Sequence, residues 1–191
     1  MKDCDLKKIK RYAEKCYKEA NCTYGDEGGS YMIHINMVVD FLTKHIAVFK
    51  NLEDAVHTLG AADCHDLMED AKQTYTDIKK VAGKDVADIT LGVTDVPAEN
   101  RLMKHLLTMG KTVRDYRAII LKMADIYSNA KFSKESRSSM YPKYAAEYLY
   151  RRPIFGSALI WYRNDLNEME LLEIFRELDE IHGYKGYAEN L

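Results

Sequence analysis

The chain has 191 residues, of which 47% are hydrophobic and 30% charged, and its formal net charge is −2. This length suffices to bury the core of one domain, and the near-neutral charge gives no bulk attraction to nucleic acid or to an anionic membrane. The N-terminus is charged where a secretory signal needs an apolar segment, and the longest uncharged apolar stretch, residues 153–162, is too short to span a bilayer. We therefore expect a single cytoplasmic domain over residues 1–191, with reduced, structural cysteines at Cys4, Cys16, Cys22 and Cys64.

Apolar residues recur at helical spacing along almost the whole chain, and alternating strand patterns are missing. The pattern predicts an all-α fold, a helical bundle of about eight to ten helices. In the first part of the chain a glycine-containing loop over 21–30 separates predicted helices at 5–20 and 31–50. Asn51 is a plausible N-cap for the next helix, which we expect to continue through the acidic segment AADCHDLMEDA at 61–71.

The second part of the chain continues this helical pattern. Thr74 and Asp77 have the spacing of a capping box, and Gly83 ends the short helix that they begin. Gly110 is expected to end another helix, the polar stretch 131–142 to be a flexible connection, and Pro153 to break the helix that follows it. Helices are predicted over residues 74–83, 85–91, 98–109, 112–132, 142–152, 154–162 and 168–182.

The segment HDLMED, residues 65–70, places one histidine and three carboxylates within six positions. In a continuous helix His65 lies four residues before Glu69, and Asp66 lies four before Asp70, so these side chains share one broad face. Like charges at this spacing repel each other, whereas a bound divalent cation would make the arrangement favourable. A solvated helix face is the alternative interpretation, and we expect nearby Asp63 to be a surface residue.

His34 and Asp125 are further candidate ligands, because each is a polar residue in an otherwise apolar predicted helix. Either residue taken alone is better explained as a hydrogen-bonded core residue. Together with His65 and Asp66 they form a set of two histidines and two carboxylates, which suits manganese, iron or magnesium better than structural zinc. The other histidines, His45, His57, His105 and His182, are expected to be structural or solvent-exposed.

Four segments resemble, in order and spacing, the hydrolase domain of the Rel/SpoT enzymes and their small single-domain relatives: YMIHINMVV, AADCHDLMEDA, TYTDIKKVAGKDVADITLGVTD and ILKMADIYSN. These are HD-superfamily phosphohydrolases that remove the 3′-pyrophosphate of ppGpp and pppGpp. The resemblance covers about residues 6–132, with further helices over 139–183. It implies an HD-type helical bundle that acts as one hydrolase domain.

The resemblance also implies roles for individual residues. It implies a divalent metal, Mn²⁺, held by His34, His65, Asp66 and Asp125. It gives Glu69 and Asp70 the task of orienting and deprotonating a metal-bound water, which is coherent because a divalent ion lowers the pKa of such a water. Asn129 is placed beside the nucleotide ribose, and Lys122, which matches a lysine common in the family, is a further candidate for binding the substrate.

Two departures from the family pattern concern substrate recognition. Gly25 and Asp26 stand where the family has a basic Arg-Lys pair, which would weaken the hold on a highly charged nucleotide, and Ile126 replaces the usual arginine of the ADR sequence. Cations next to tyrosines after residue 130 could compensate for the missing basic pair, and Tyr144 is a candidate to stack on a base. A solvated helix explains these residues equally well. These residues are Lys131, Lys134, Arg137, Lys143, Arg151 and Arg152, among Tyr141, Tyr144 and Tyr148.

The sequence thus predicts a metal-dependent (p)ppGpp 3′-pyrophosphohydrolase that binds a phosphorylated nucleotide and neither nucleic acid nor membrane. One alternative is an HD-type phosphatase for another nucleotide, for example at the 2′-phosphate of NADPH. Another is a non-catalytic, metal-binding regulatory module. Whether the protein is a monomer or a homo-oligomer stays open.

Overall fold

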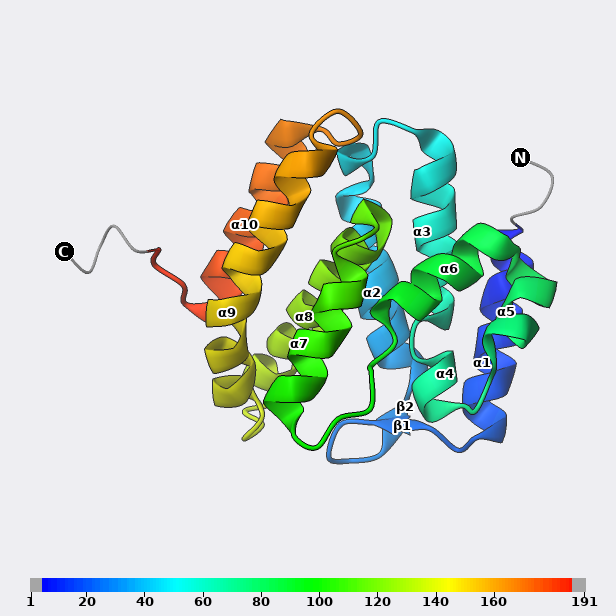
Figure 1. Ribbon diagram of the computed structural model, residues 1–191. Helices are drawn as coiled ribbons and strands as arrows, with labels where there is room; N and C mark the ends of the chain where they lie inside the picture. The colour runs from blue at the N-terminus through cyan, green and yellow to red at the C-terminus, as the bar shows by residue number, and fades with distance from the viewer. Residues whose placement is uncertain (1–4, 187–191) are drawn as a thin grey trace.

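The computed structural model describes residues 5–186, so Cys4 lies outside the described part (Figure 1). The all-α prediction is confirmed, with a small hairpin of β1 (Thr23–Tyr24) and β2 (Gly29–Ser30) in the loop between the first two helices. The helices are α1 (Leu6–Glu19), α2 (Met32–Lys44), α3 (Leu52–Cys64), α4 (Leu67–Asp70), α5 (Tyr75–Ala82), α6 (Lys84–Val93), α7 (Arg101–Thr112), α8 (Tyr116–Glu135), α9 (Tyr141–Leu159) and α10 (Glu168–His182), with 3-10 turns at Ile46–Val48 and Ile160–Tyr162.

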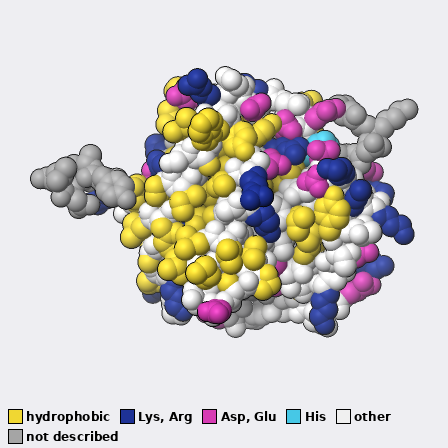
Figure 2. All heavy atoms as spheres, in the orientation of Figure 1, with side chains coloured by type: hydrophobic (Ala, Val, Ile, Leu, Met, Phe, Trp, Pro, Cys, Tyr) yellow, Lys and Arg dark blue, Asp and Glu magenta, His cyan; other side chains and the backbone are white. Residues whose placement is uncertain are grey.

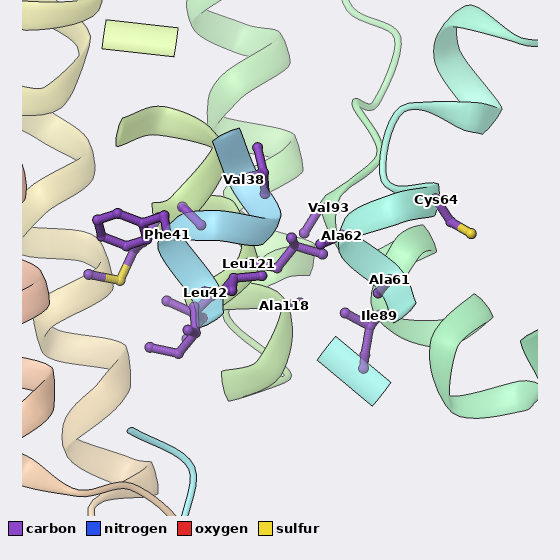
Figure 3. Packing of buried hydrophobic residues seen from close by; sticks show 14 of the residues in the cluster. Val38, Phe41, Leu42, Ala61, Ala62, Cys64, Ile89, Val93, Ala118 and Leu121 are labelled. Atoms are coloured by element: carbon purple, nitrogen blue, oxygen red, sulfur yellow. The ribbon is translucent and has the colours of Figure 1, made fainter. Parts of the chain in front are cut away.

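Helix α8 is the centre of the bundle, and α2, α3, α6, α9 and α10 pack around it. Its residues Ile119 to Leu121 are fully buried, as expected for a helix that is covered on all sides. Figure 3 shows α2, α3 and α6 contributing to the same apolar core as α8. Small residues allow close approach: a Cβ at Gly92 of α6 would lie 3.0 Å from the Cβ of Ala118 in α8.

The predicted continuous helix through AADCHDLMEDA is wrong, because α3 ends at Cys64 and α4 begins at Leu67. His65 Nδ1 donates a hydrogen bond to the Ala62 carbonyl at 2.8 Å, and the Asp66 carbonyl accepts from Asp70 N at 2.8 Å to start a new turn. The break lets His65 and Asp66 face the centre of the bundle while Glu69 and Asp70 follow on a separate short helix.

Several other predicted boundaries are also corrected. The helix over 31–50 stops at Lys44, α7 passes through Gly110, and most of the expected connection at 131–142 is helical. Pro153 lies inside α9, so the separate helix at 154–162 does not exist. Tyr148 and Phe155 flank this proline in the core, and their packing outweighs the hydrogen bond that proline cannot make.

Hydrophobic side chains are also visible on the surface, spread over the face formed by α7 and α9 (Figure 2). In these two helices Leu102, Met103, Leu106, Leu107 and Leu149 are each 43–57% exposed. Among the described helices, none has the length and apolar character needed to cross a membrane.

Candidate metal centre and charged cavity

Four of the predicted ligand residues converge at one point inside the bundle. His34 comes from the first turn of α2, His65 and Asp66 from the break between α3 and α4, and Asp125 from the middle of α8. His34 Nε2 lies 3.1 Å from His65 Nε2 and 3.4 Å from Asp66 Oδ2. Asp125 Oδ1 lies 3.3 Å from His34 Nε2 and 3.8 Å from His65 Nε2.

The donor atoms suit a divalent cation. His65 donates through Nδ1 to the Ala62 carbonyl, which leaves Nε2 free to face Asp66 Oδ2 at 3.1 Å. One ligand atom from each of His34, His65 and Asp66 can be chosen such that all three lie within 4.8 Å of one another. Imidazole nitrogen and carboxylate oxygen are ordinary ligands for such ions, so the described residues form a candidate metal site.

Charge compensation holds these groups together. Burial would raise the pKa of Asp66, but His65 and His34 hold it well below its ordinary value. Burial would likewise lower the pKa of His65, but Asp66 and Asp125 raise it well above the usual range. The carboxylates and imidazoles thus stabilise each other's charged forms, and a divalent cation would displace the imidazole protons on binding.

Lys122 and Asn129 both contact Asp125. Lys122 Nζ lies 2.9 Å from Asp125 Oδ2, and Asn129 Nδ2 donates to Asp125 Oδ1 at 2.6 Å. Burial would raise the pKa of Asp125, but Lys122 and the imidazoles hold it well below its ordinary value. The two residues that the sequence assigned to substrate therefore also fix the orientation and charge of Asp125.

Glu69 and Asp70 of α4 lie beside the candidate metal site. Glu69 Oε1 accepts a hydrogen bond from the backbone N–H of Asp95 at 2.8 Å, and desolvation raises the pKa of Glu69 to about 7, with the charge of Asp95 adding to the effect. Asp70 Oδ2 accepts from the Tyr31 hydroxyl at 2.5 Å. Sequence reasoning missed Tyr31, although it lies only three residues before His34.

These groups line a cavity of about 350 Å³ whose other walls come from α7, α8 and α9. Its cations Arg101, Lys104, Lys122 and Arg151 are paired with acids: Arg101 and Arg151 with Glu147, Lys104 with Asp95 and Lys122 with Asp125. Tyr144 also lines the cavity, with its ring 6.0 Å from the Arg101 guanidinium carbon. The cavity therefore combines a candidate cation site with several positive groups, an arrangement suited to phosphates.

The hairpin closes one side of this cavity through Tyr24. The Tyr24 ring stacks on His34 with centroids 4.9 Å apart, and its hydroxyl donates to Asn129 Oδ1 at 3.0 Å. Gly25 has a φ of +77°, and a Cβ at this position would lie 2.8 Å from Phe132 Cζ. A side chain at position 25 would therefore be strained by the positive φ and would require the Phe132 ring to shift.

The structure bears on three further expectations, of which only the surface position of Asp63 is wrong. Of the cations and tyrosines named above after residue 130, only Arg151 and Tyr144 line the cavity. Arg152 forms an ion pair with Asp179 instead. His105 lines the cavity, and burial and the nearby Arg151 lower its pKa to about 4, which keeps it neutral. Asp63 is 5% exposed and is not a surface residue.

The α7 cations were also missed by sequence reasoning. Arg101 and Lys104 stand three residues apart in RLMKH, a spacing that puts them on one helix face. This spacing was the available signal, but nothing in the sequence indicates that α7 lies across the cavity from His34.

No protein-family model matches the chain. A guanosine-3′,5′-bis(diphosphate) 3′-pyrophosphohydrolase of Spiroplasma citri is 30% identical over 139 residues, covering 68% of this chain and 17% of that protein. The bifunctional (p)ppGpp synthase/hydrolase SpoT of Escherichia coli (strain K12) is 37% identical over 79 residues, covering 36% of this chain and 11% of that protein. The chain thus spans less than a fifth of the length of these relatives.

Among solved structures, one described as a metazoan ortholog of SpoT that hydrolyzes ppGpp superposes with a TM-score of 0.68 at 20% identity, covering 95% of both chains. The fold and the site define an all-α domain with a candidate metal centre at the floor of a charged cavity. More particularly, the chain is similar in sequence to (p)ppGpp 3′-pyrophosphohydrolases that include SpoT, and it shares the fold of the metazoan SpoT ortholog.

Proposed function

We propose that the protein removes the 3′-pyrophosphate of (p)ppGpp, with Mn²⁺ held by His34, His65, Asp66 and Asp125. The observation that carries the proposal is the convergence of these side chains beside Glu69, in a cavity that also holds four cations. The sequence relatives are named for this reaction, which supports the same substrate. A nucleotide of this kind would place the reaction in the cytoplasm.

A divalent ion at this site would lower the pKa of water and offset the negative charge that develops at the attacked phosphorus. Glu69, with its pKa near 7, can take the proton of the attacking water, and Asp70 can orient that water by accepting a hydrogen bond. The water oxygen forms a bond to the phosphorus, and the bond between this phosphorus and the 3′-oxygen breaks. The 3′-oxygen takes up a proton, which yields GDP or GTP and pyrophosphate.

The cations of α7 and α9 would hold the phosphates. Arg101 and Arg151 both pair with Glu147, which keeps them extended toward the cavity before substrate arrives. Lys104 is held in the same way by Asp95. These residues offer the positive charge that the hairpin lacks at Gly25 and Asp26.

The test is an assay of the purified protein with Mn²⁺ and ppGpp, followed by chromatography of the products. GDP and pyrophosphate should appear in equal amounts, and Asp66→Ala should abolish them. Asp179→Asn, in the ion pair of Arg152 outside the cavity, is the control and should keep the activity within about twofold. Unchanged activity in Asp66→Ala would contradict the assignment of the site.

A phosphatase for another phosphorylated nucleotide is the second candidate, and the geometry at Gly25 favours it. Because a side chain at position 25 would be strained and would meet the Phe132 ring, the substrate contacts of the hairpin differ from the family pattern. A panel of nucleotides that includes ppGpp, pppGpp and NADPH, compared by kcat/KM, separates the two candidates. A preference for ppGpp by orders of magnitude would eliminate the second one.

A further inference from the structure

The hydroxyl of Tyr31 lies between two carboxylates with different tasks. Its oxygen is 2.7 Å from Asp66 Oδ2 and 2.5 Å from Asp70 Oδ2. We propose that Tyr31 is a positioning residue that couples cation binding at Asp66 to the placement of Asp70; this inference rests on the proposed function.

The coupling between Asp66 and Asp70 follows because the Tyr31 hydroxyl has only one proton to donate. A phenol has one O–H group, so it can donate to only one of the two carboxylates at a time. Asp66 Oδ2 is also the oxygen that lies 3.1 Å from His65 Nε2, so it faces the candidate metal site. When a divalent cation binds to this oxygen, the oxygen becomes a poorer acceptor. The Tyr31 hydroxyl then donates its hydrogen bond to Asp70 alone.

This hydrogen bond decides where the Asp70 carboxylate lies. Asp70 is an exposed residue at the end of the four-residue helix α4, and within residues 5–186 no side chain other than Tyr31 donates a hydrogen bond to its carboxylate. Donation from Tyr31 to Oδ2 holds the carboxylate in one orientation and leaves the second oxygen as an acceptor at the cavity. Cation binding would thus fix the acid that orients the attacking water.

The ring of Tyr31 is held independently of its hydroxyl. It packs against Tyr17 with centroids 4.8 Å apart, and its edge contacts to Tyr24 and His34 have centroid distances of 6.2 and 6.0 Å. Tyr31→Phe should therefore keep the aromatic packing and remove only the shared donor.

The matched control is Tyr17→Phe. The Tyr17 hydroxyl donates to the backbone carbonyl of Asp63 at 3.3 Å and, among the described residues, makes no hydrogen bond to the side chain of Asp66 or Asp70. Both variants remove one hydroxyl from the same aromatic pair, so a difference between them reports the contact with Asp66 and Asp70.

The first measurement uses metal-free protein and needs no activity. Adding Mn²⁺ should produce a near-ultraviolet tyrosine difference spectrum, whose main component is lost in Tyr31→Phe and kept in Tyr17→Phe. The dissociation constant for Mn²⁺, from calorimetry, should stay within about threefold of the wild type in both variants. A difference spectrum that persists in Tyr31→Phe would overturn the inference.

The second measurement is steady-state kinetics with ppGpp. Tyr31→Phe should lower kcat by about 10- to 100-fold with KM within about twofold, while Tyr17→Phe keeps both within about twofold. An unchanged kcat in Tyr31→Phe, or an equal loss in kcat and Mn²⁺ affinity, would overturn the inference. A wild-type protein inert toward ppGpp would instead overturn the proposed function and leave the spectral comparison as the test of the coupling.

Discussion

Glu69 has a carboxyl group inside the cavity, with its pKa raised to about 7 by desolvation and by the neighbouring Asp95 charge. A general base must be ionised, so kcat/KM should increase as the pH rises through about 7. Glu69→Gln should lower kcat by about 10² to 10⁴ and remove this increase, as measured in a pH series at saturating Mn²⁺. A variant that keeps the wild-type pH profile would exclude Glu69 as the base.

Asp63 is also a buried carboxylate with a raised pKa, but its burial lowers the stability of the folded protein. It is 5% exposed, its Oδ1 atom is buried without a hydrogen-bond partner, and burial raises its pKa from 3.8 to about 6. The folded state therefore holds a proton that the unfolded state releases, and stability falls as the pH rises from about 4 to 6. Above pH 6 the full cost of ionising the carboxyl is present.

Asp63→Asn should therefore stabilise the protein at pH 7.5 by about 1–2 kcal/mol. At pH 4 the wild-type carboxyl is already protonated in the folded state, so the difference between the two proteins should largely vanish. Urea unfolding at both pH values measures the change. An equal effect at both would show that the charge of Asp63 is not the cause.

Helix α5 is set by local signals that can be read from the sequence. Thr74 Oγ1 accepts from Asp77 N at 3.2 Å, and Asp77 Oδ2 accepts from Thr74 N at 3.0 Å, which completes a capping box. Thr74→Ala should lower the free energy of unfolding by about 1 kcal/mol. Thr76→Ala, at an exposed position within the same helix, is the control and should be neutral or slightly stabilising; chemical denaturation compares them.

The accuracy of the predicted elements depends on whether local or tertiary interactions determine their ends. Helix α10 begins and ends as predicted because Asn167 caps it and Gly183, with a φ of +67°, stops it. The ends near Gly110 and Pro153 were wrong because packing of the surrounding helix outweighs the local preference of these residues. The break at His65 was missed because it depends on a side-chain hydrogen bond to the Ala62 carbonyl.

The same distinction between local and tertiary interactions applies to the candidate site. The sequence indicated which residue types could form it, since a histidine or aspartate in an apolar helix is conspicuous at His34 and Asp125. It could not indicate the opposite wall of the cavity, because α7 and α9 reach it only through the arrangement of the whole bundle. Asp63 was misplaced for the same reason: its burial depends on α1, which packs against α3. The extent of the single domain over residues 1–191 stays a prediction.

At the scale of the whole molecule, the four proposed ligands connect α2, α8 and the break between α3 and α4, so a bound cation should stabilise the entire bundle. At a Mn²⁺ concentration of 100 times the dissociation constant, linkage predicts about 2.7 kcal/mol. For a chain of this size this is a rise in Tm of about 5–10 °C. Differential scanning calorimetry with and without Mn²⁺ measures it.

Asp125→Asn is the variant for this experiment, because it removes the charge of one proposed ligand while retaining its shape. The Mn²⁺-dependent rise should be abolished or strongly reduced. Asp179→Asn should show the full rise, since Asp179 pairs with Arg152 away from the proposed ligands. A rise of equal size in all three proteins would place the stabilising ion elsewhere.

The close contact between Gly25 and Phe132 links the hairpin to the end of α8, two segments more than a hundred residues apart in sequence. A side chain at position 25 would press on that ring, which packs against Tyr24, and the Tyr24 ring in turn stacks on His34. Substitutions at positions 25 and 132 are therefore coupled. A basic residue at position 25 would therefore require a shift of the Phe132 ring or a smaller residue at position 132, and either change would alter the wall of the cavity beside His34.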